Sequence, residues 1–395
     1  MNLSPGKFAS FISITTFSKL LFNIARRLIY PFAPEFARGL NVDLSAITSA
    51  IAVNQATSLL GPVGAGFADR YGYKLLMLIS VALLTIGCFS VGLIPTYAVL
   101  LISLFLAGLA KSIFDPSLQA FIGNYVPFEK RGRIIGITEL AWAGSTLLGI
   151  PAAGLIIERF SWQTPFFIIS GLSLVCFFLI LRIMPSDKRQ PSATGTASNS
   201  MRQNWQHILE QRPVLGILSF VFFMSLANDN LFVIYGAWLE SSYQLSLVAI
   251  GFGTIFIGLS EVMGEGCTAV LSDRIGLKRS VIIGTSVCAA AYLTLPMLDT
   301  GLARVLAGLF LVFFTFEFTI VTAMSLTTEM VPHLRASTMG AFYATAGIGR
   351  VIGAFSGGMI WSRHALTGIC LVSGICTLAA LLSLFWGMKH DKSNE

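Results

Sequence analysis

Charged and amide side chains interrupt several long apolar stretches of this sequence. The set that we single out comprises Lys19, Asn23, Arg26, Lys111, Asp115, Asn228, Asp229 and Glu317. Such groups are costly in apolar surroundings, and they usually bind a polar solute, carry protons or pair with one another. Carboxylates in such places can titrate near neutral pH, as proton transfer requires. We therefore expect solute binding and proton transfer, with simple structural pairing as the alternative.

Two sets of these residues are spaced as on one face of a helix. Lys19, Asn23 and Arg26 follow one another at intervals of four and three residues, which places them on one face of a helix. Lys111 and Asp115 are four residues apart and also share a helix face, where they could neutralise each other. Both stripes require helices that turn the polar groups away from lipid, toward water or toward one another.

The charges inside the apolar stretches differ between the two halves of the chain. The first half carries four cations and two carboxylates, at Lys19, Arg26, Arg27, Lys111, Asp115 and Glu139. The second half carries one cation and four carboxylates, at Arg350, Asp229, Glu261, Glu265 and Glu317. Either the basic side binds an anionic group while the acidic side carries protons, or the two sides pair as gates. For proton transfer, the first choices are Asp229 and Glu317, followed by Glu139 and Glu261.

The composition indicates which elements hold these groups. Of the 395 residues, 55% are hydrophobic and 11% are charged, and the mean hydropathy is +0.77. Soluble domains carry about 25% charged residues. The apolar runs approach the roughly 20 residues of a membrane-spanning helix and exceed the roughly 10 residues of a barrel strand. We therefore predict an all-α membrane protein.

Twelve apolar segments predict twelve transmembrane helices. They cover residues 8–30, 44–68, 75–95, 97–125, 134–158, 163–184, 213–240, 246–271, 279–297, 301–330, 337–361 and 365–388. Residues 185–212 are rich in Ser, Thr, Asn, Gln and charge. We interpret them as a cytoplasmic linker between a six-helix bundle at 1–184 and a second bundle at 213–395, which ends in a short cytoplasmic tail.

The positions of Lys and Arg predict the orientation in the membrane. Seventeen of the 26 fall on the side that includes both termini and the linker, and four fall on the opposite side. Cytoplasmic loops carry the excess of Lys and Arg, so both termini are predicted to be cytoplasmic in a cell membrane. The same bias accounts for the net charge of +7, which therefore does not indicate nucleic-acid binding.

A repeat with a fixed offset of 204 residues relates the two halves. The matching pairs are Asp69 and Asp273, Arg70 and Arg274, Gly72 and Gly276, Lys74 and Lys278, Arg131 and Arg335, Gly136 and Gly340, Gly149 and Gly353, and Gly154 and Gly358. Each half has six spans, so the two halves run in the same direction through the membrane. This is a parallel repeat about an axis along the membrane normal.

The repeated loop after the second and eighth segments, (A/G)xxxDRxGxK, carries a family resemblance. Together with the twelve spans and the parallel repeat, it resembles the major facilitator superfamily over essentially the whole chain, closest to the branch of 12-span proton antiporters for drugs and metabolites. The resemblance implies two pseudo-symmetric six-helix bundles with a cavity between them. It also implies a conformational latch formed by Asp69, Arg70, Gly72, Lys74, Asp273, Arg274, Gly276 and Lys278.

Two further motifs of that family are only partly matched. GSTLLGIPAAG at residues 144–154 is similar to the family's antiporter motif, but Ile150 separates Gly149 from Pro151. Many proton-coupled exporters of the family carry an Arg in the fourth span, where this chain has Leu104. The proton mechanism based on that Arg therefore does not carry over, and the carboxylates inside the spans become the candidates.

The resemblance implies secondary active transport of a small organic solute by alternating access, and we favour proton-coupled efflux. The alternatives are import or facilitated diffusion of an organic anion, a lipid or lysolipid flippase, and a membrane sensor or scaffold without transport. The sequence lacks a nucleophile–base pair, a metal-ligand cluster and a phosphate-binding loop, so we expect no enzyme, cofactor or metal. The expected partners are the solute, protons and the lipid bilayer, and a monomer is expected.

Overall fold

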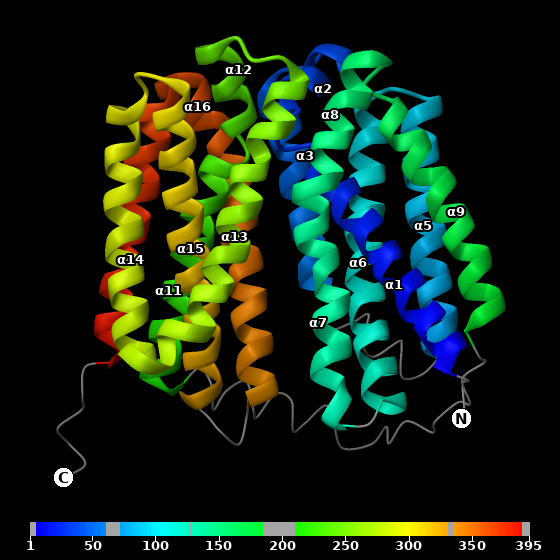
Figure 1. The fold of residues 1–395 in the computed structure, drawn as a ribbon. Coiled ribbons are helices and arrows are strands. Elements are labelled where there is room, and N and C mark those ends of the chain that lie inside the picture. The colour runs from blue at the N-terminus through cyan, green and yellow to red at the C-terminus, as the bar shows by residue number, and fades with distance from the viewer. Residues whose placement is uncertain (1–4, 61–71, 127, 185–209, 331–334, 389–395) are drawn as a thin grey trace. The chain divides into compact units, whose positions relative to one another are not determined.

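The computed structural model describes residues 5–60, 72–126, 128–184, 210–330 and 335–388. All regular elements in these ranges are helices, and η2 is a short π-helix (Figure 1). Their bounds are α1 (Pro5–Arg27), α2 (Ala33–Leu40), α3 (Leu44–Ala56), η1 (Thr57–Leu60), α5 (Tyr73–Leu93), α6 (Tyr97–Tyr125), α7 (Phe128–Gly144), η2 (Ser145–Gly149), α8 (Ile150–Arg159), α9 (Thr164–Ile183), α11 (Arg212–Phe232), α12 (Tyr235–Tyr243), α13 (Leu247–Ile275), α14 (Leu277–Thr294), η3 (Leu295–Leu298), α15 (Leu302–Met330) and α16 (Arg335–Met388).

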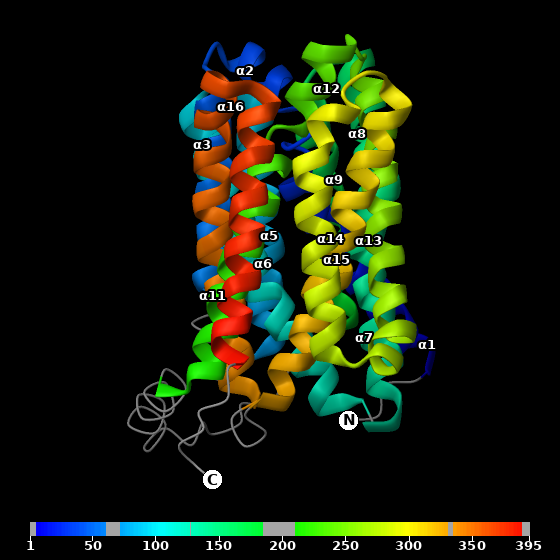
Figure 2. The ribbon, with the colours of Figure 1, turned by 90° about the vertical axis from the view of Figure 1, so that its left-hand side faces the viewer.

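Ten helical stretches in the described ranges are long and apolar enough to cross a membrane. The last, Thr338–Met388, has 51 residues and holds two spans, because the non-helical backbone of Ala365 separates two arms of α16 (Figure 2). A shorter apolar stretch covers Leu44–Leu60, and the rest of that predicted span, 61–68, lies outside the described residues. With these two additions the helices match the twelve apolar segments and confirm the predicted all-α membrane fold.

The helices form two compact units. Unit 1 contains residues 1–192 and 235–255, and unit 2 contains residues 193–234 and 256–395. The segment 235–255, which comprises α12 and the start of α13, therefore packs within unit 1 although it follows the linker in the sequence. The division of the chain into bundles at 1–184 and 213–395 stays a prediction.

Glycines allow the segment 235–255 to approach its neighbours in unit 1. A Cβ atom at Gly236 would collide with the carbonyl oxygen of Pro31. A Cβ atom at Gly154 in α8 would lie 2.8 Å from the carbonyl oxygen of Leu247. Both contacts are made by backbone atoms, which cannot move aside as a flexible side chain can. The lack of a side chain at these two positions thus brings α12 and the start of α13 against the rest of unit 1.

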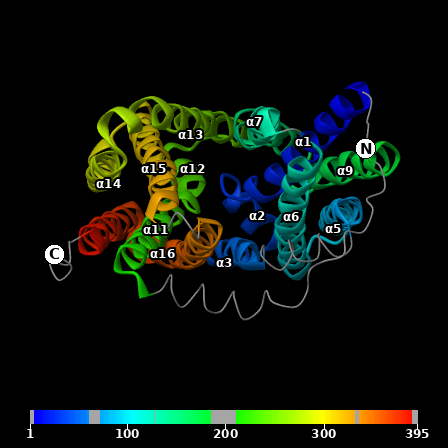
Figure 3. The same ribbon diagram turned by 90° about the horizontal axis from the view of Figure 1, so that it is seen from below.

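The remaining packing of unit 1 positions α1 at its centre. α1 lies against α6, α7 and α9, and α5 packs against both α6 and α9 (Figure 3). Phe11 of α1 contacts Phe121 of α6, and Phe22 contacts Phe114. Residue numbers rise along α1 as they fall along α6, so these two helices run antiparallel.

In unit 2, the helix α11 is held between the two arms of α16 (Figure 3). Gly349, Gly353 and Gly357 of the first arm are spaced four apart and face the backbone of α11. In the second arm, a Cβ atom at Gly387 would lie 2.8 Å from the Cα atom of Gly216 in α11. Small residues at such spacing let membrane helices approach at backbone distance and pack by van der Waals contact.

The corresponding glycines of the two repeated loops, Gly72 and Gly276, have the same backbone conformation. Gly72 has φ 93° and ψ 145°, and Gly276 has φ 92° and ψ 135°. These angles lie in a region that side-chain-bearing residues rarely adopt, so glycine is required at both turns. Each glycine directly precedes a helix, α5 or α14, and starts a membrane span at the same point of the repeat.

Candidate functional site

The five polar residues predicted in the first and fourth spans share one face of the α1–α6 pair. Phe22 and Phe114 mark the line of contact, with ring centroids 5.0 Å apart. When two helices run antiparallel, the residues that directly follow a pair of contacting residues point to the same side of the helix pair. Residues one helical turn before or after them point to that side as well. Lys19, Asn23 and Arg26 on α1 and Lys111 and Asp115 on α6 thus form one surface, which we name the α1–α6 face.

An ion pair joins this face to α7. Lys19 Nζ donates to Glu139 Oε1 at 2.6 Å. The two side chains differ in burial, because Lys19 is 5% exposed and Glu139 is 48% exposed. The ammonium is therefore buried among the helices of unit 1, whereas about half of the Glu139 side chain is exposed. One turn further along α7, Trp142 lies under the guanidinium of Arg27, with 4.2 Å from Cζ to the ring centroid.

The second ion pair lies within α6. Lys111 Nζ donates to Asp115 Oδ2 at 2.6 Å, and both side chains are largely buried. This confirms that the two residues face each other one turn apart. The contact of Phe22 with Phe114 places Lys111 on the same face as Lys19 and Arg26. The α1–α6 face, together with Glu139, therefore combines three cations with two carboxylates.

Neutral amides hold the guanidinium of Arg26. Its Nε donates to Asn54 Oδ1 at 2.8 Å, and its Nη2 donates to Gln55 Oε1 at 3.2 Å. Gln55 donates in turn to the Tyr30 hydroxyl, and Asn54 donates to the carbonyl of Leu104. This network fixes the direction of the arginine. The sequence signal for it was present, because Asn54 and Gln55 are adjacent amides in an apolar segment.

Asn23 lies between these charged groups and is 1% exposed. Its Oδ1 and Nδ2 atoms are both buried, and neither has a hydrogen-bond partner among the described residues. The second oxygen of Asp115, Oδ1, is also buried without such a partner. Buried polar atoms without partners are rare in proteins and are commonly satisfied by a water molecule or a ligand.

The predicted polar residues of the second half lie in unit 2. Asp229 on α11 is 2% exposed, and Arg350 of α16 places its Nε 3.9 Å from Asp229 Oδ2. Asn228 is 8% exposed, and Glu261 on α13 is 9% exposed. Glu317 is half-buried where α15 crosses Gly264 of α13. Asp229 and its neighbours therefore gather along α11, while Glu317 lies at the contact between α13 and α15 and Glu261 is buried on α13.

The predicted latch residues are only partly described. Asp69 and Arg70 lie outside the described residues, as does the side chain of Asp273. Lys74 Nζ donates to the carbonyl oxygens of Leu181 and Met184, so it satisfies the carboxyl end of α9. A cation is favourable at that end of a helix. Arg274 and Lys278 are exposed at the corresponding turn of unit 2.

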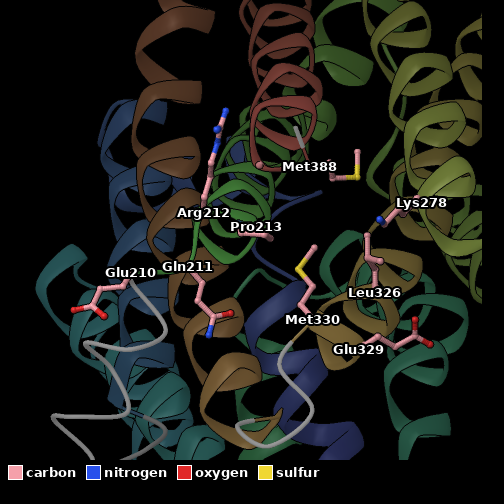
Figure 4. A pocket seen from close by; sticks show the side chains of 10 residues that line it. Glu210, Gln211, Arg212, Pro213, Lys278, Leu326, Glu329, Met330 and Met388 are labelled. Atoms are coloured by element: carbon pink, nitrogen blue, oxygen red, sulfur yellow. The ribbon is translucent and has the colours of Figure 1, made fainter. Parts of the chain in front are cut away.

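Lys278 lines a cavity of about 590 Å³ at one end of unit 2 (Figure 4). The other side chains of its wall come from the ends of α11, α15 and α16, with Arg212, Glu329 and Met330 among them. Arg212 is held in place by Trp386, whose carbonyl accepts from Nε at 3.0 Å. This cavity contains none of the polar residues predicted within the spans.

Unit 1 also contains an ionic contact that sequence reasoning missed. Arg38 of α2 donates from Nη1 to Glu240 Oε1 of α12 at 2.6 Å and from Nη2 to Glu35 Oε2 at 2.7 Å. Burial by itself lowers the pKa of Arg38, but the hydrogen bonds and negative charges of the two glutamates raise it above its ordinary value. Glu158 of α8 accepts from the backbone N–H of Val248 at 2.8 Å. These contacts fasten the segment 235–255, and we name them the α12 clamp.

We expect Arg38→Glu to loosen α12 and the double variant with Glu240→Arg to restore it. Exposed ion pairs contribute about 0.2–1 kcal/mol, and the side chain of Arg38 is 54% exposed. Hydrogen exchange of the α12 amides should therefore quicken by about twofold to fivefold in the single variant. Equal exchange rates in the wild type, the single variant and the charge-swapped variant would show that the clamp does not hold α12.

Within the described ranges, no group of three or more His, Cys, Asp or Glu side chains could hold a metal ion. The cysteines described are free thiols inside the helices. What the structure brings together is a set of oppositely charged and amide groups within each unit. Such an arrangement can bind a polar solute and exchange protons.

Comparisons with known proteins agree with this arrangement. The family model described as "Major Facilitator Superfamily" matches residues 15–354 and 218–395. The uncharacterized MFS-type transporter YceJ of Bacillus subtilis (strain 168) is 27% identical over 348 residues, which cover 87% of this chain and 86% of YceJ. The multi-drug resistance efflux pump PmrA homolog of Lactococcus lactis subsp. lactis (strain IL1403) is 24% identical, with 71% and 72% covered.

The fold has a counterpart among solved structures. A bacterial homolog of the human lysosomal transporter Spinster, in its inward-facing and unoccupied conformation, superposes with a TM-score of 0.79. The match covers 97% of this chain and 95% of that one, at 13% identity, so it shows the fold alone. Family match, fold and membrane spans together confirm the expectation of a multi-pass transporter that is not an enzyme. The chain belongs to the Major Facilitator Superfamily.

Proposed function

We propose that the protein exports a small organic solute by alternating access, in exchange for protons, across a cell membrane with both of its termini in the cytoplasm. Similarity to a multi-drug resistance efflux pump homolog supports the export direction. The bundles at 1–184 and 213–395 are the moving bodies in this proposal, and the latch residues of the two repeated loops time their movement. The protein acts as a monomer.

The observation that carries the proton coupling is the ion pair between Lys19 and Glu139. Its carboxylate is half-exposed, whereas the ammonium is buried among the helices, so in this proposal Glu139 is the group that takes up and releases the proton. Protonation of Glu139 removes the negative partner and leaves the Lys19 charge buried. A buried charge that loses its partner costs several kcal/mol. Proton binding therefore disfavours this conformation of unit 1 and favours one in which Lys19 reaches water.

Other carboxylates complete the proton pathway in this proposal. Asp229, next to Arg350, is a second candidate of the same kind, since it is a buried acid beside a cation. Glu317 at the contact between α13 and α15 and Glu261 on α13 extend the set. All of them differ from Glu139 in being less accessible, so Glu139 is the group that exchanges its proton with water first.

The test uses proteoliposomes with an imposed pH gradient. The solutes are labelled phenylbutyrate, its neutral amide phenylbutyramide and the amine phenylbutylamine, with protein-free liposomes as the correction for passive partition. A proton antiporter accumulates a transported solute in an acidic interior, and a protonophore abolishes the accumulation. Flux of a transported solute that ignores both the gradient and the protonophore would contradict proton coupling.

A second candidate function, facilitated diffusion of an organic anion, is favoured by the cations of the α1–α6 face. In that case phenylbutyrate would reach only the passive distribution of a weak acid, which favours the alkaline compartment, and would not accumulate in the acidic one. Measurements in the same vesicles distinguish the two functions. Only a proton-coupled exporter would concentrate phenylbutyrate in the acidic compartment, because a weak acid that crosses passively favours the alkaline one.

A further inference from the structure

Corresponding lysines of the two repeats have different surroundings. In unit 1, Lys74 donates to two carbonyl oxygens at the carboxyl end of α9. The repeat offset of 204 residues relates Lys74 to Lys278, Leu181 to Phe385 and Met184 to Met388. In unit 2, Lys278 makes neither these hydrogen bonds nor an ion pair with any residue that the structure describes. The place that a lysine fills in unit 1 is therefore open in unit 2.

A cavity lies at this open place, and we name it the Lys278 cavity (Figure 4). Its volume is about 590 Å³, and its wall includes Lys278, Leu326, Glu329 and Met388. A second cavity of about 480 Å³ shares Lys278, Leu326 and Glu329 with it and adds Arg279. Cavities of about 300–1,000 Å³ are typical of sites for small molecules. The open place in unit 2 is thus large enough for a bound group.

The Lys278 cavity carries charges of both signs. Lys278 and Arg212 are its cations, and Glu210 and Glu329 are its carboxylates. None of the four forms an ion pair with a residue in the described ranges. A ligand with a single kind of charge would meet two groups of its own sign, which is unfavourable. A ligand with one anionic and one cationic group would match both signs.

The position of the cavity in the fold indicates where such a ligand comes from. The spans α11, α14, α15 and α16 all begin or end at its wall, so it lies at the depth of lipid head groups. The guanidinium of Arg212 lies over the ring of Trp386, with 5.0 Å from Cζ to the centroid, and Trp386 is 49% exposed. Tryptophan is enriched at the membrane–water interface. This setting favours a lipid over a dissolved solute.

The neighbouring surface of α16 suits the rest of a lipid. Leu382, Phe385 and Trp386 are exposed, and their spacing of three and four residues places them on one face of the second arm of α16. This apolar stripe ends two residues before Met388, which lines the cavity. Acyl chains can therefore lie along the stripe while the head group reaches the cavity.

We propose that the Lys278 cavity binds the head group of a phospholipid that carries a phosphate and a primary ammonium, as phosphatidylethanolamine does. The phosphate lies beside Lys278. The ammonium lies beside Glu329 and the carboxyl end of α16, where it takes the part that Lys74 has in unit 1. A cation is favourable at that end of a helix, and a primary ammonium has three N–H donors. The site concerns the surrounding lipid and does not depend on the transported solute.

The test measures lipid binding to the purified full-length protein in detergent by native mass spectrometry. The probes are the dioleoyl forms of phosphatidylethanolamine, phosphatidylcholine and phosphatidylglycerol, which share their acyl chains. We expect the dissociation constant for phosphatidylethanolamine to be at least about threefold lower than the other two, as one extra exposed ion pair allows. Equal constants for all three lipids, or strongest binding of phosphatidylglycerol, would overturn the proposal.

Two variants separate the roles of the charged groups. Glu329 and Lys278 are exposed, so Glu329→Gln and Lys278→Gln should melt like the wild type. Glu329→Gln should remove only the preference for phosphatidylethanolamine, whereas Lys278→Gln should weaken all three lipids by about threefold, because all three carry a phosphate. Glu329→Lys should make phosphatidylglycerol the preferred lipid. An unchanged preference in Glu329→Gln and unchanged constants in Lys278→Gln would contradict the assignment.

A matched control and a soluble probe complete the test. Arg304→Gln removes an exposed cation at the opposite end of α15, where Arg304 donates to Thr300, and should leave all constants unchanged. O-phosphoethanolamine carries the same charged groups without acyl chains, so at the lipid's concentration it should not displace phosphatidylethanolamine. Displacement at that concentration would show that the cavity binds a dissolved solute, and it would overturn the assignment to a lipid. None of these results depends on proton coupling.

Discussion

Replacing Glu139 with Gln should lower proton-driven transport by about a hundredfold, a change of about 2.7 kcal/mol in the coupled step. Gln keeps the size of the side chain and mimics the protonated acid, so the variant should remain folded and favour the conformation in which Lys19 reaches water. The Gln side chain cannot take up or release a proton at neutral pH. The variant therefore lacks the carboxylate whose charge must change during each transport cycle. Transport is measured as accumulation in proteoliposomes with an acidic interior. Full gradient-driven accumulation in the variant would exclude Glu139 as the coupling group.

Two further variants show whether the ion pair behaves as its burial implies. Glu139→Leu leaves the sealed ammonium of Lys19 without a partner, whereas Lys19→Met leaves a half-exposed carboxylate that water can solvate. Breaking a buried pair costs about 3–5 kcal/mol when the remaining charge stays buried. The melting temperature should thus fall further in Glu139→Leu than in Lys19→Met. Glu210→Gln, at an exposed acid ahead of α11, serves as the control with unchanged transport.

Replacing Gly353 with Leu should prevent unit 2 from folding into a stable form. The first atom of the new side chain would lie 2.6 Å from the carbonyl oxygen of Leu226 and 3.0 Å from Asp229 Cβ. One of these is a backbone atom, so α11 must move as a whole. Overpacking of this kind costs about 1–3 kcal/mol and more where the backbone is displaced. The measurement is the fraction of monodisperse protein after extraction, together with its melting temperature.

The matched control lies in the same helix. At Gly340, one of the repeat glycines, an added Cβ atom meets no described atom within 4 Å. Gly340→Leu should therefore extract and melt like the wild type, and it should gain slightly from its better helix propensity. If the two variants behaved alike, the packing of α11 against α16 would not be what stabilises unit 2.

The sequence predicted the elements and the polar stripes because both follow from periodicity. The helical spacing of Lys111 and Asp115 was enough to place them in contact, and the stripe of Lys19, Asn23 and Arg26 was enough to place it on one face. The pairing of Lys19 with Glu139 was not predictable in this way. Those residues are 120 positions apart, so only the packing of α1 against α7 brings them together.

Other contacts could not be predicted because they depend on how separate helices pack against one another. The amides that hold Arg26 lie on α3, and nothing in a single sequence shows which face of α3 meets α1. The ion pair of the α12 clamp joins Arg38 on α2 to Glu240 on α12, 202 positions apart, and apolar patterning gives no information on such a pair. The family's antiporter motif departs by one residue at Ile150, and the π-helix η2 directly before it is the kind of turn that accommodates one extra residue in a helix.

A change in the protonation of Glu139 during transport can be observed directly by infrared spectroscopy. Infrared difference spectra of the reconstituted protein, recorded with and without phenylbutyrate, detect the carbonyl band of a protonated carboxylic acid and its shift in heavy water. The account predicts a solute-dependent band of this kind in the wild type and in Glu210→Gln, and its loss in Glu139→Gln. The same band at full strength in Glu139→Gln, or its absence from a wild-type protein that binds the solute, would contradict it.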